Sequence, residues 1–539
     1  RSFPSSHSFL LDIRCAMNLT PEDRQVGKDN FNEALGVGRR DFLKGVIAGG
    51  VATGAGLGAT YFGYGKTVDN PVRVGIIGTG DEGGVLIGAL NPKYVEVKAI
   101  SDIRQFSQHR AFHGDITNLD ARPGLMAKYG WKSEDEAKKH VKVFETYADL
   151  LKESDIEAVI IALPLHLHHE AAIAAMHAGK HVLTEKLMGH DIGKCKDMAR
   201  TSDATKLLLA TGHQRHYSAL YDNAVNLLKW GILGELHHIR AQWHRGNLPG
   251  KDQWRPPLPG GEMIHKDGKM VHFDRILKEL KELKKAREEE KSPKKMMELE
   301  KRIAQWEAWN ADRDLKAELF GYVTKNLDDG RPRSAMEELC RWRIWDRTGG
   351  GLMAELGSHQ LDAASIFCSA LRTDGKKAHP ISVHSVSGRH TFPLDREADD
   401  HVYCIFEFPA PGYDLNKFDV GYRDDSLNYP DPKKGIPAYT EDKNKRIVVT
   451  YSSINGNGFG SYGEVVMGSK GTLILEREKD VMLFRGDSTS TKVAVKDEGG
   501  GPTMTSYETG GGAAAALASA ATAGEVSRGY TEEIEHWAW

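Results

Sequence analysis

The sequence predicts an α/β protein, with a doubly wound parallel sheet toward the N-terminus and a second α/β domain that carries a large, mostly antiparallel sheet. Two patterns predict this fold class. Between residues 72 and 213, short apolar runs alternate with helical segments, as in parallel sheets covered by helices. After residue 348, one helical segment is followed by strand-like runs in direct succession, which favours antiparallel pairing. These runs are 381–388, 401–408, 446–452, 463–467 and 472–477.

Composition and charge narrow the possible functions. At 539 residues the chain is too long for one ordinary hydrophobic core, so two or more domains are expected. With 27% charged residues and a net charge of −3, it gives no reason to expect nucleic acid or an anionic membrane as a partner. The five cysteines are scattered and form no CxxC motif, which argues against a disulfide framework and a thiolate zinc site. No metal site is predicted.

The first apolar run leads directly into a glycine-rich turn. Residues 72–77 predict a buried strand, Gly78, Thr79, Gly80 and Gly83 follow at once, and the next helix is expected after them. This order is typical of a dinucleotide site. Gly78 permits the tight turn, Gly80 lets the backbone approach a pyrophosphate, and Gly83 lets helix and strand pack closely. The N–H groups at the helix N-terminus would face the phosphates.

An acidic residue stands where a dinucleotide ribose would bind. The next strand-like run ends at Asp102, roughly 20 residues beyond the glycines, where a carboxylate can bind the ribose 2′-OH. Asp102 would repel a 2′-phosphate, so NAD is the expected cofactor, although Arg104 leaves NADP open. The alternative is a plain strand–helix–strand turn that binds no nucleotide.

Further polar residues follow later strands of the same predicted sheet. Pro164, the pair Glu185-Lys186, and His213 each come just after a strand-like run. Ligands of such sheets bind outside the carboxyl ends of the strands, where these residues and Asp102 would gather. A lysine at this edge can place its ammonium group beside a reacting hydroxyl.

A second group of chemically capable residues follows a run of three glycines at 349–351. Glu355 and His359 are four residues apart and would share one face of a helix, with Asp362 about one turn further on. The spacing alone leaves three possibilities open. The residues could form a surface pair, a metal-ligand pair or an acid–base pair.

The N-terminal segment carries a pattern typical of protein export in bacteria. Arg39 and Arg40 precede a weakly apolar run, rich in glycine and alanine, that extends to about residue 64. This predicts a twin-arginine signal and a periplasmic or otherwise exported protein. The run is too interrupted for a stable membrane span, so membrane contact is expected only through an uncleaved signal. The alternative is a disordered tail with a chance pair of arginines.

Residues 250–345 are predicted to be a helical insertion. Apolar residues recur at helical spacing in two runs, namely Phe273, Ile276, Leu277, Leu280 and Leu283, then Met296, Leu299, Ile303 and Trp306. Between the runs, Ser292-Pro293 predicts an N-cap followed by proline at the first helical position. We expect an antiparallel hairpin of helices with a charged outer face. It could be a plain surface feature, an oligomer contact or a lid over the cleft.

These motifs, in this order, resemble those of the Gfo/Idh/MocA oxidoreductases, named for glucose–fructose oxidoreductase and inositol dehydrogenase. The resemblance covers about residues 72–362 and rests on Gly78–Gly83, Asp102, Leu163–His168, Gly179–Lys186 and Gly349–Asp362. It implies a Rossmann NAD(P)-binding domain followed by an α/β domain whose open sheet covers the cleft. It also implies NAD(P)-dependent oxidation or reduction of a sugar or cyclitol hydroxyl, and a homo-oligomer formed through the open sheet.

The resemblance implies a role for each candidate residue. Lys186 matches the family's catalytic lysine, His359 matches its catalytic histidine, and Glu355 stands where many members have aspartate. The implied cofactor-binding residues are Gly78, Thr79, Gly80, Gly83, Asp102, Pro164, His168 and Glu185. Asp362, His213 and Arg215 are the candidates for substrate binding. The chain departs from the family pattern in Leu187, where a proline is usual, and in Leu163 and Leu165, where Thr and Asn are usual.

The expected mechanism places a secondary hydroxyl between Lys186 and His359. His359 would accept the hydroxyl proton, Lys186 would polarise the oxygen, and Glu355 would orient the imidazole or the sugar, while hydride passes to C4 of the nicotinamide. Two other functions remain open. An NAD-dependent glycosidase would oxidise the sugar transiently and release it without net NADH, and a non-catalytic sugar or nucleotide sensor would bind without turnover.

These observations give a plan of the whole chain. Residues 1–16 are expected to be an upstream extension, 17–70 the tail with the export signal, and 71–215 the Rossmann domain. Residues 216–539 would form the α/β substrate and oligomerisation domain, with the insertion at 250–345. The last residues predict an amphipathic helix without a stop signal, so a truncated C-terminus is expected.

Overall fold

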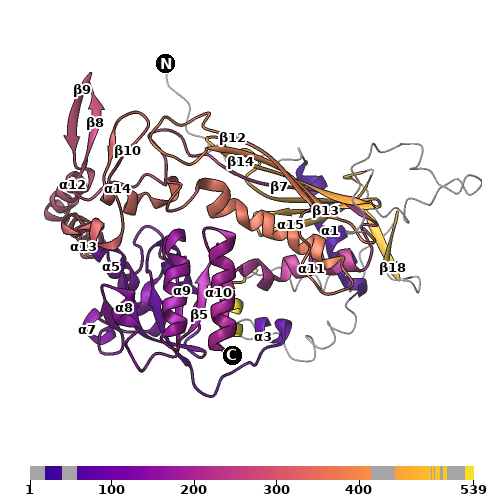
Figure 1. Ribbon diagram of the computed structural model, residues 1–539, viewed down its shortest axis with the longest axis horizontal. Helices are drawn as coiled ribbons and strands as arrows, with labels where there is room; N and C mark the ends of the chain where they lie inside the picture. Colours follow the sequence, from indigo (N-terminus) through magenta and orange to yellow (C-terminus); the bar gives the residue numbers. More distant parts are fainter. Residues whose placement is uncertain are drawn as a thin grey trace, which may run out of the picture.

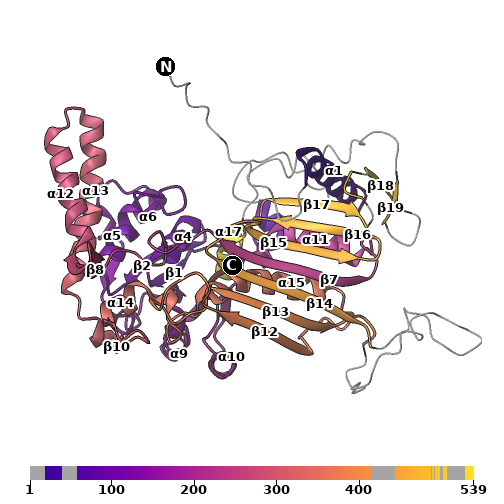
Figure 2. The ribbon, with the colours of Figure 1, turned by 90° about the horizontal axis from the view of Figure 1, so that it is seen from above.

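The computed structural model describes residues 19–38, 57–413, 444–486, 488–490, 492–497, 502–506 and 528–539. They form two sheet domains, one beside the other, with a pair of long helices next to the first (Figures 1 and 2). Arg39, Arg40 and the first part of the apolar run that follows lie outside the described residues. Within the described part of the chain, no helix is long and apolar enough to cross a membrane.

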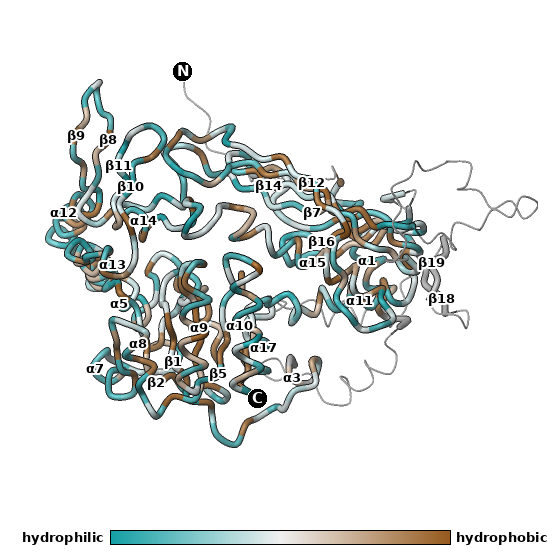
Figure 3. Tube along the Cα trace, in the orientation of Figure 1, coloured by the Kyte–Doolittle hydropathy of each residue, from teal (hydrophilic) through white to brown (hydrophobic). Residues whose placement is uncertain are grey.

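The first domain contains a parallel sheet in the order β3-β2-β1-β4-β5-β6. The strands are β1 (Val72–Ile77), β2 (Val95–Ser101), β3 (Lys142–Phe144), β4 (Ala158–Ile161), β5 (His181–Glu185) and β6 (Leu209–Gly212). This order belongs to the doubly wound dinucleotide-binding fold. The central strand β4 is apolar and buried at every position, and its neighbours β1 and β5 are buried over most of their length. Brown stretches mark β1 and β5 in Figure 3.

Short helices connect these strands. They are α4 (Asp81–Ala89), α5 (Gln105–His113), α6 (Gly124–Tyr129), α7 (Glu134–Ala137), α8 (Tyr147–Leu150), η1 (Leu165–Leu167), α9 (His168–His177) and α10 (Ile192–Thr205). Several begin at a side chain that caps the first turn. Ser133, Thr146 and Asp191 accept hydrogen bonds from backbone N–H groups of α7, α8 and α10. The helix α4, which was expected to begin after the glycine motif, begins within it, at Asp81.

The second domain is built on a larger mixed sheet in the order β12-β13-β14-β7-β15-β16-β17. The strands are β7 (Leu236–Arg245), β12 (Ser382–Gly388), β13 (His401–Pro409), β14 (Arg446–Asn455), β15 (Tyr462–Gly468), β16 (Gly471–Glu476) and β17 (Asp480–Arg485). Only the β14–β7 pair is parallel among the described strands of this sheet. The predicted fold class, a parallel sheet followed by a mostly antiparallel one, is confirmed.

Helices cover one face of this sheet. They are α1 (Pro21–Gly38), η2 (Gln214–Tyr217), α11 (Ala219–Lys229), the π-helical turn η6 (Met353–Gly357) and α15 (Ser358–Ala370). Apolar side chains of α1, α11 and α15 form one core with β7, β14, β16 and β17. On the opposite face, Val386 of β12 is 71% exposed and Ile405 of β13 is 46% exposed. The β12–β13 end of this face is therefore open, whereas the part on β15–β17 is covered, because Val465, Ile474, Met482 and Phe484 are buried there.

Three helices near the ends of the described chain pack in places that the domain plan does not foresee. Phe31 and Leu35 of α1 lie in the core of the second domain, although residues 17–70 were assigned to a tail. In contrast, α3 (Leu57–Phe62) and the C-terminal helix α17 (Tyr530–Ala538) pack on the first domain, where Ile534 is fully buried. The last described helix, α17, thus follows the second domain in sequence but packs against the first domain.

The insertion contains the predicted antiparallel pair of helices, α12 (Arg275–Glu289) and α13 (Pro293–Ala311). Ser292 is the N-cap of α13 and proline follows it, as predicted, whereas Phe273 ends a strand and is not part of α12. The remaining elements of this region are β8 (Glu262–Lys266), β9 (Lys269–Phe273), η3 (Asp312–Asp314), η4 (Ala317–Phe320), β10 (Lys325–Asn326), β11 (Pro332–Arg333), α14 (Ala335–Cys340) and η5 (Trp342–Ile344). A separate small hairpin is formed by β18 (Val493–Asp497) and β19 (Pro502–Ser506).

Candidate active site

A cavity of about 710 Å³ lies at the carboxyl ends of β1, β2, β4 and β5 and is also bounded by segments of the second domain and the insertion. Of the fourteen residues predicted to act in catalysis, cofactor binding or substrate binding, eight line it, namely Gly78, Gly80, Asp102, Pro164, His168, Glu185, Lys186 and Glu355. Thr79, Gly83, His213, Arg215, His359 and Asp362 do not belong to its lining. The structure therefore brings the glycine turn and the lysine into one space.

The glycine turn has the geometry that a dinucleotide requires. Gly78 has a φ of +88°, and a Cβ on it would lie 2.5 Å from the carbonyl oxygen of Ala162. A Cβ on Gly83 would lie 2.3 Å from the carbonyl oxygen of Gly78, so helix and strand are in close contact there. A Cβ on Gly80 would meet no atom within 4 Å and would project into open space. The backbone of Gly80 therefore lines the cavity with no side chain in front of it, at the place where a pyrophosphate would bind.

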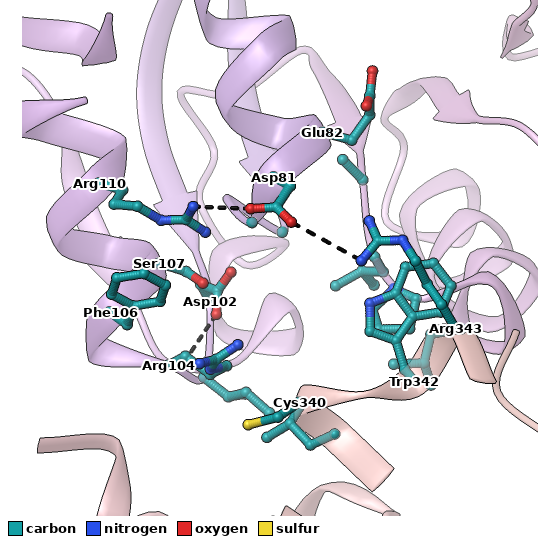
Figure 4. A pocket seen from close by; sticks show the side chains of 18 of the residues that line it. Asp81, Glu82, Asp102, Arg104, Phe106, Ser107, Arg110, Cys340, Trp342 and Arg343 are labelled. Atoms are coloured by element: carbon teal, nitrogen blue, oxygen red, sulfur yellow. Dashed lines mark hydrogen bonds and ion pairs between the residues drawn. The ribbon is translucent and has the colours of Figure 1, made fainter. Parts of the chain in front are cut away.

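Arginines surround the start of α4 beside this turn (Figure 4). Arg110 Nη1 lies 2.9 Å from Asp81 Oδ1, and Arg343 Nη1 lies 4.0 Å from Asp81 Oδ2. Arg122 Nε donates to the carbonyl oxygen of Asp81 at 2.8 Å. Burial alone would raise the pKa of Asp81, but these arginines lower it well below its ordinary value. Two arginines from the first domain and one from the second therefore stand beside the glycine turn and keep Asp81 ionised.

Asp102 is held at the end of β2 by backbone donors. Its Oδ2 accepts a hydrogen bond from Thr79 N at 2.9 Å, and its Oδ1 accepts one from Arg104 N at 2.9 Å. Burial raises the pKa of Asp102, while these two hydrogen bonds favour the ionised form. Oδ2 also accepts a hydrogen bond from Thr79 Oγ1 at 3.4 Å, whereas Oδ1 keeps a further lone pair that can accept a hydroxyl donor from a ribose.

Lys186 connects the two domains inside the cavity. It follows β5, and its Nζ donates a hydrogen bond to the main-chain carbonyl oxygen of Glu355. The Lys186–Leu187 peptide bond is cis. His168 lies beneath this loop, with Nδ1 2.7 Å from the carbonyl oxygen of Leu187 and Nε2 2.8 Å from that of Leu163. In this position His168 ties the loop after β5 to the loop after β4.

Glu355 stands in a π-helical turn, Met353–Gly357, which the sequence predicted to be ordinary α-helix. Its carboxylate is almost buried, and its Oε2 lies 3.3 Å from Arg343 Nε. Gly357 ends the turn against the second sheet, because a Cβ there would lie 1.5 Å from the hydroxyl oxygen of Tyr451. The wider turn gives Glu355 and His359 a different angular offset from the one that an ordinary α-helix would give them.

His359 is buried at the start of α15, beside the cavity and outside its lining. Its ring lies 6.1 Å from that of Trp243 on β7. Burial, together with the positive charges of Lys186 and Arg215, holds the pKa of His359 well below its ordinary value of 6.5. The imidazole is therefore neutral at neutral pH, which is the form that can accept a proton.

The three predicted substrate-binding residues have different surroundings. Asp362 Oδ2 lies 3.1 Å from His216 Nε2. Burial would raise the pKa of Asp362, but this hydrogen bond and neighbouring charges that include His213 lower the pKa to about 2. Arg215 is fully buried, with Nη2 2.6 Å from Glu478 Oε1. Its guanidinium is thus committed to an internal ion pair, away from the cavity. No group of three or more possible metal ligands occurs among the described residues.

Sequence reasoning missed the part of the site that the insertion supplies. Gln305, Trp306 and Trp309 of α13 line the cavity, together with Trp342 and Arg343. These residues face the first domain although they are 200 or more positions away from Asp102 in sequence. Trp306 and Trp309 were the available signal. Two tryptophans one helical turn apart are large apolar side chains on one helix face, and such a face is usually buried against another part of the protein.

Comparison with protein families identifies the first domain. Residues 72–213 match the Gfo/Idh/MocA model, described as an oxidoreductase family with an NAD-binding Rossmann fold. The match confirms the resemblance for this segment and agrees with NAD as the predicted cofactor. The Gly78, Gly80 and Asp102 geometry fits that cofactor. When bound, it would be held by the glycine turn and Asp102 and would supply a hydride acceptor.

Several curated proteins are similar to part of the chain. A protein of Shewanella amazonensis, named as a glycosyl hydrolase family 109 protein, is 31% identical over 242 residues, which covers 41% of this chain and 50% of the relative. An uncharacterized oxidoreductase of Schizosaccharomyces pombe is 27% identical over 196 residues, covering 36% of this chain and 48% of the relative. The chain spans about half the length of the curated relatives that it matches.

Solved structures of dehydrogenases also align with the chain. The WlbA dehydrogenase of Bordetella pertussis, in complex with NADH and UDP-GlcNAcA, matches with a TM-score of 0.43 at 13% identity, over 78% of this chain and 79% of that one. Levoglucosan dehydrogenase in complex with NADH matches with a TM-score of 0.41 at 14% identity, over 82% of this chain and 81% of that one.

Proposed function

We propose that this protein is an NAD-dependent oxidoreductase that transfers hydride between NAD and a hydroxyl group of a sugar or cyclitol. The observation that carries the proposal is the contact of Lys186 with the Glu355 main chain inside the cavity that also contains Gly80 and Asp102. A lysine at the end of β5 is thereby held within the space that a dinucleotide would share with a small substrate.

The chemistry follows from the protonation states of these groups. Lys186 carries three N–H donors, and Glu355 takes one, so two are free to polarise a substrate oxygen. His359 is neutral and can accept the hydroxyl proton as the carbon loses its hydride. The Glu355 carboxylate, paired with Arg343, would orient the substrate. The bound cofactor would receive the hydride at C4 of its nicotinamide.

The composition of the cavity supports a small polar substrate. Trp254 and Trp342 line it together with Arg245 and Gln253. Arg245 Nη2 lies 3.2 Å from Gln253 Oε1, so an amide fixes the direction of this guanidinium. Large aromatic faces with a few well-placed polar groups are typical of sites for small molecules, and they suit a ring that has both C–H faces and hydroxyl edges.

A second candidate is an NAD-dependent glycosidase that oxidises its sugar only transiently. The observation that favours it is the similarity to proteins named for glycosyl hydrolase family 109, which reaches 31% identity over 242 residues. Such an enzyme would use the same Lys186 to polarise the sugar hydroxyl and the same His359 to take its proton, with bound NAD as the hydride acceptor. The aglycone would leave, water would take its place on the sugar, and the hydride would then return to the oxidised carbon.

A panel experiment separates these functions. The protein is denatured, its released nucleotide is identified by mass spectrometry, and fresh protein is incubated with free sugars, cyclitols and aryl glycosides. Accumulation of NADH with a free sugar or cyclitol supports the dehydrogenase. Release of the aglycone without net NADH supports the glycosidase. Bound NAD with neither product across the panel contradicts both and leaves the sensor function.

We propose in addition that the chain is exported through the twin-arginine pathway and forms a homo-oligomer. Export is supported by the sequence pattern of Arg39 and Arg40 before a Gly/Ala-rich run. Self-association is supported by the exposed β12–β13 end of the second sheet, where Val386 and Ile405 face outward. Replacing both arginines by lysine should retain a reporter fusion of residues 17–70 in the cytoplasm, and multi-angle light scattering should give a mass above that of one chain.

A further inference from the structure

Asp312, at the foot of the insertion, makes an unusual pair of contacts with the first domain. It follows α13 directly, and its side chain is completely buried. Its Oδ2 accepts a hydrogen bond from Arg104 Nε at 2.8 Å, and its Oδ1 accepts one from Phe106 N at 3.2 Å. One carboxylate therefore neutralises an arginine and satisfies a backbone N–H in the first turn of α5.

These two donors belong to the loop that recognises the adenosine ribose. Arg104 is two residues beyond Asp102, and its backbone N–H binds the Asp102 carboxylate (Figure 4). An arginine in this loop is the residue type that accommodates a 2′-phosphate in this fold. A guanidinium beside a free N–H at a helix start is also a favourable place for an anion in general. Here that place is filled by a carboxylate of the same chain.

We propose that Asp312 acts as an internal substitute for the 2′-phosphate of NADP and thereby makes the site selective for NAD. The proposal deepens the proposed function, on which it rests, and makes Asp312 a positioning residue that acts through Arg104. Because the Asp312 carboxylate occupies the N–H of Phe106 and the Nε of Arg104, a 2′-phosphate finds these donors taken. In the cavity it would also meet the carboxylate of Asp102, while the buried Asp312 carboxylate behind Arg104 neutralises the charge that a phosphate needs.

The insertion holds Asp312 firmly in place. The rings of Trp309 and Phe106 are stacked, with centroids 4.5 Å apart and planes at 17°. One turn earlier on α13, Gln305 Oε1 accepts a hydrogen bond from Ile116 N at 2.9 Å, and its Nε2 donates to Asp115 Oδ1 at 3.2 Å. Moving Asp312 aside to admit a phosphate would break these contacts. Selectivity is thus supplied by the insertion as well as by the parallel sheet.

The test measures dinucleotide binding and does not depend on turnover. Dissociation constants of NAD and NADP are determined by calorimetry for the wild type and for Asp312→Asn, after removal of any nucleotide that is bound on purification. We expect the wild type to prefer NAD by about 100-fold or more, and Asp312→Asn to bind NADP about tenfold or more tightly than the wild type does, with a smaller change for NAD. Asp314→Asn, an exposed change in the same turn, should leave both constants unchanged.

A second pair of variants tests whether Asp312 acts through Arg104. In an Arg104→Ala background, Asp312→Asn should give no gain in NADP affinity, because the guanidinium that would meet the phosphate is absent. Adenosine 2′,5′-bisphosphate and 5′-AMP serve as probes that carry no nicotinamide, and only the first should gain affinity in Asp312→Asn. Asp312→Ser, with a smaller side chain, has the same expected result and replaces Asp312→Asn if that variant has a low melting temperature.

The possible outcomes are distinct. Wild-type binding of NAD with an unchanged NAD:NADP ratio in both Asp312 variants overturns the inference and leaves the proposed function standing. A gain in NADP affinity that persists without Arg104 also overturns it, since Asp312 would then act by another route. Failure of the wild type to bind either dinucleotide would overturn the proposed function and this inference together.

Discussion

The ammonium group of Lys186 donates a hydrogen bond to the main-chain carbonyl oxygen of Glu355, and this contact links the end of β5 to the π-helical turn of the second domain. The acceptor is a backbone oxygen, so the position of the ammonium depends on the path of the turn and not on a side-chain rotamer. The two remaining N–H donors of Lys186 are available to a ligand in the cavity. Several measurable consequences follow from this arrangement and from its surroundings.

Replacing Lys186 by methionine should abolish most of the turnover with little effect on dinucleotide binding. The change removes the donor that stabilises the developing negative charge on the substrate oxygen, and we expect kcat to fall by about 10²–10⁴-fold. Lys196→Met, an exposed lysine on α10, is the matched control and should keep full activity. Steady-state kinetics with NAD and the substrate from the panel check this. Retention of wild-type kcat in Lys186→Met would remove Lys186 from the mechanism.

The pH dependence of oxidation should report the depressed pKa of His359. Burial and the neighbouring charges of Lys186 and Arg215 lower this pKa, so the imidazole remains neutral, and able to accept a proton, well below pH 6.5. The rate falls only where the imidazole becomes protonated, and the acid limb of log kcat/KM against pH is therefore expected below 6.5. In His359→Gln this limb should disappear together with most of the activity. An acid limb centred above 6.5 that survives in His359→Gln would assign it to another group.

Two glycine variants should separate binding from folding. Gly80→Ala adds a methyl group that meets no protein atom within 4 Å, so the melting temperature should stay close to that of the wild type. The methyl group points into the space of the pyrophosphate, and NAD affinity should fall by about tenfold or more. Gly83→Ala instead places its Cβ 2.3 Å from the carbonyl oxygen of Gly78 and should cost about 1–3 kcal/mol of stability. Calorimetry and thermal unfolding on both variants give the comparison, which fails if Gly80→Ala binds NAD as the wild type does.

Glu533 on α17 should make the protein less stable as the pH rises. Burial raises the pKa of this carboxyl group to about 8, above its ordinary value of 4.5. Between these two values the folded state keeps a proton that the unfolded state has lost, so stability is greatest at low pH within this window and decreases toward pH 8. Glu533→Gln removes the cost of ionising the buried group and should raise the melting temperature at pH 9 relative to the wild type.

The melting temperatures of wild type and Glu533→Gln should converge at pH 5, where the wild-type carboxyl group is protonated in the folded state. Glu288→Gln, an exposed change on α12, is the control and should follow the wild type at every pH. Thermal unfolding between pH 5 and 9 provides the measurement. A melting temperature for Glu533→Gln that runs parallel to the wild-type curve would show that Glu533 does not titrate in this window.

The parallel sheet and its glycine turn were predictable because their signals are local. Strand β4 is a continuous apolar run, and β1 is apolar except at Arg73. The glycines at 78, 80 and 83 are there because the turn needs residues without a Cβ. The same holds for α13, whose start is marked by Ser292 and the proline after it. Each of these features depends on neighbours within a few residues, and a single sequence contains that information.

The rest of the site depends on contacts that local patterns do not encode. Asp312 meets Arg104 across 208 positions of sequence, and nothing in the hairpin's own periodicity says which neighbour it will face. The π-helical turn at Met353–Gly357 was predicted as α-helix, because apolar spacing over a single turn does not distinguish the two. Gly357, at the end of this turn, packs against Tyr451 of another strand, and the spacing of nearby residues does not reveal that contact. Twin-arginine export stays a prediction, since Arg39 and Arg40 lie outside the described residues.

Transfer of hydrogen from substrate to cofactor tests the central claim most directly. The protein is loaded with NAD and mixed with the active sugar or cyclitol that carries deuterium at its carbinol carbons, and the nucleotide is recovered by rapid quench and analysed by mass spectrometry and NMR. The account predicts deuterium at C4 of the nicotinamide in the wild type and none in Lys186→Met. Conversion of the substrate with no deuterium in the nucleotide at any time would contradict hydride transfer and, with it, the proposed function.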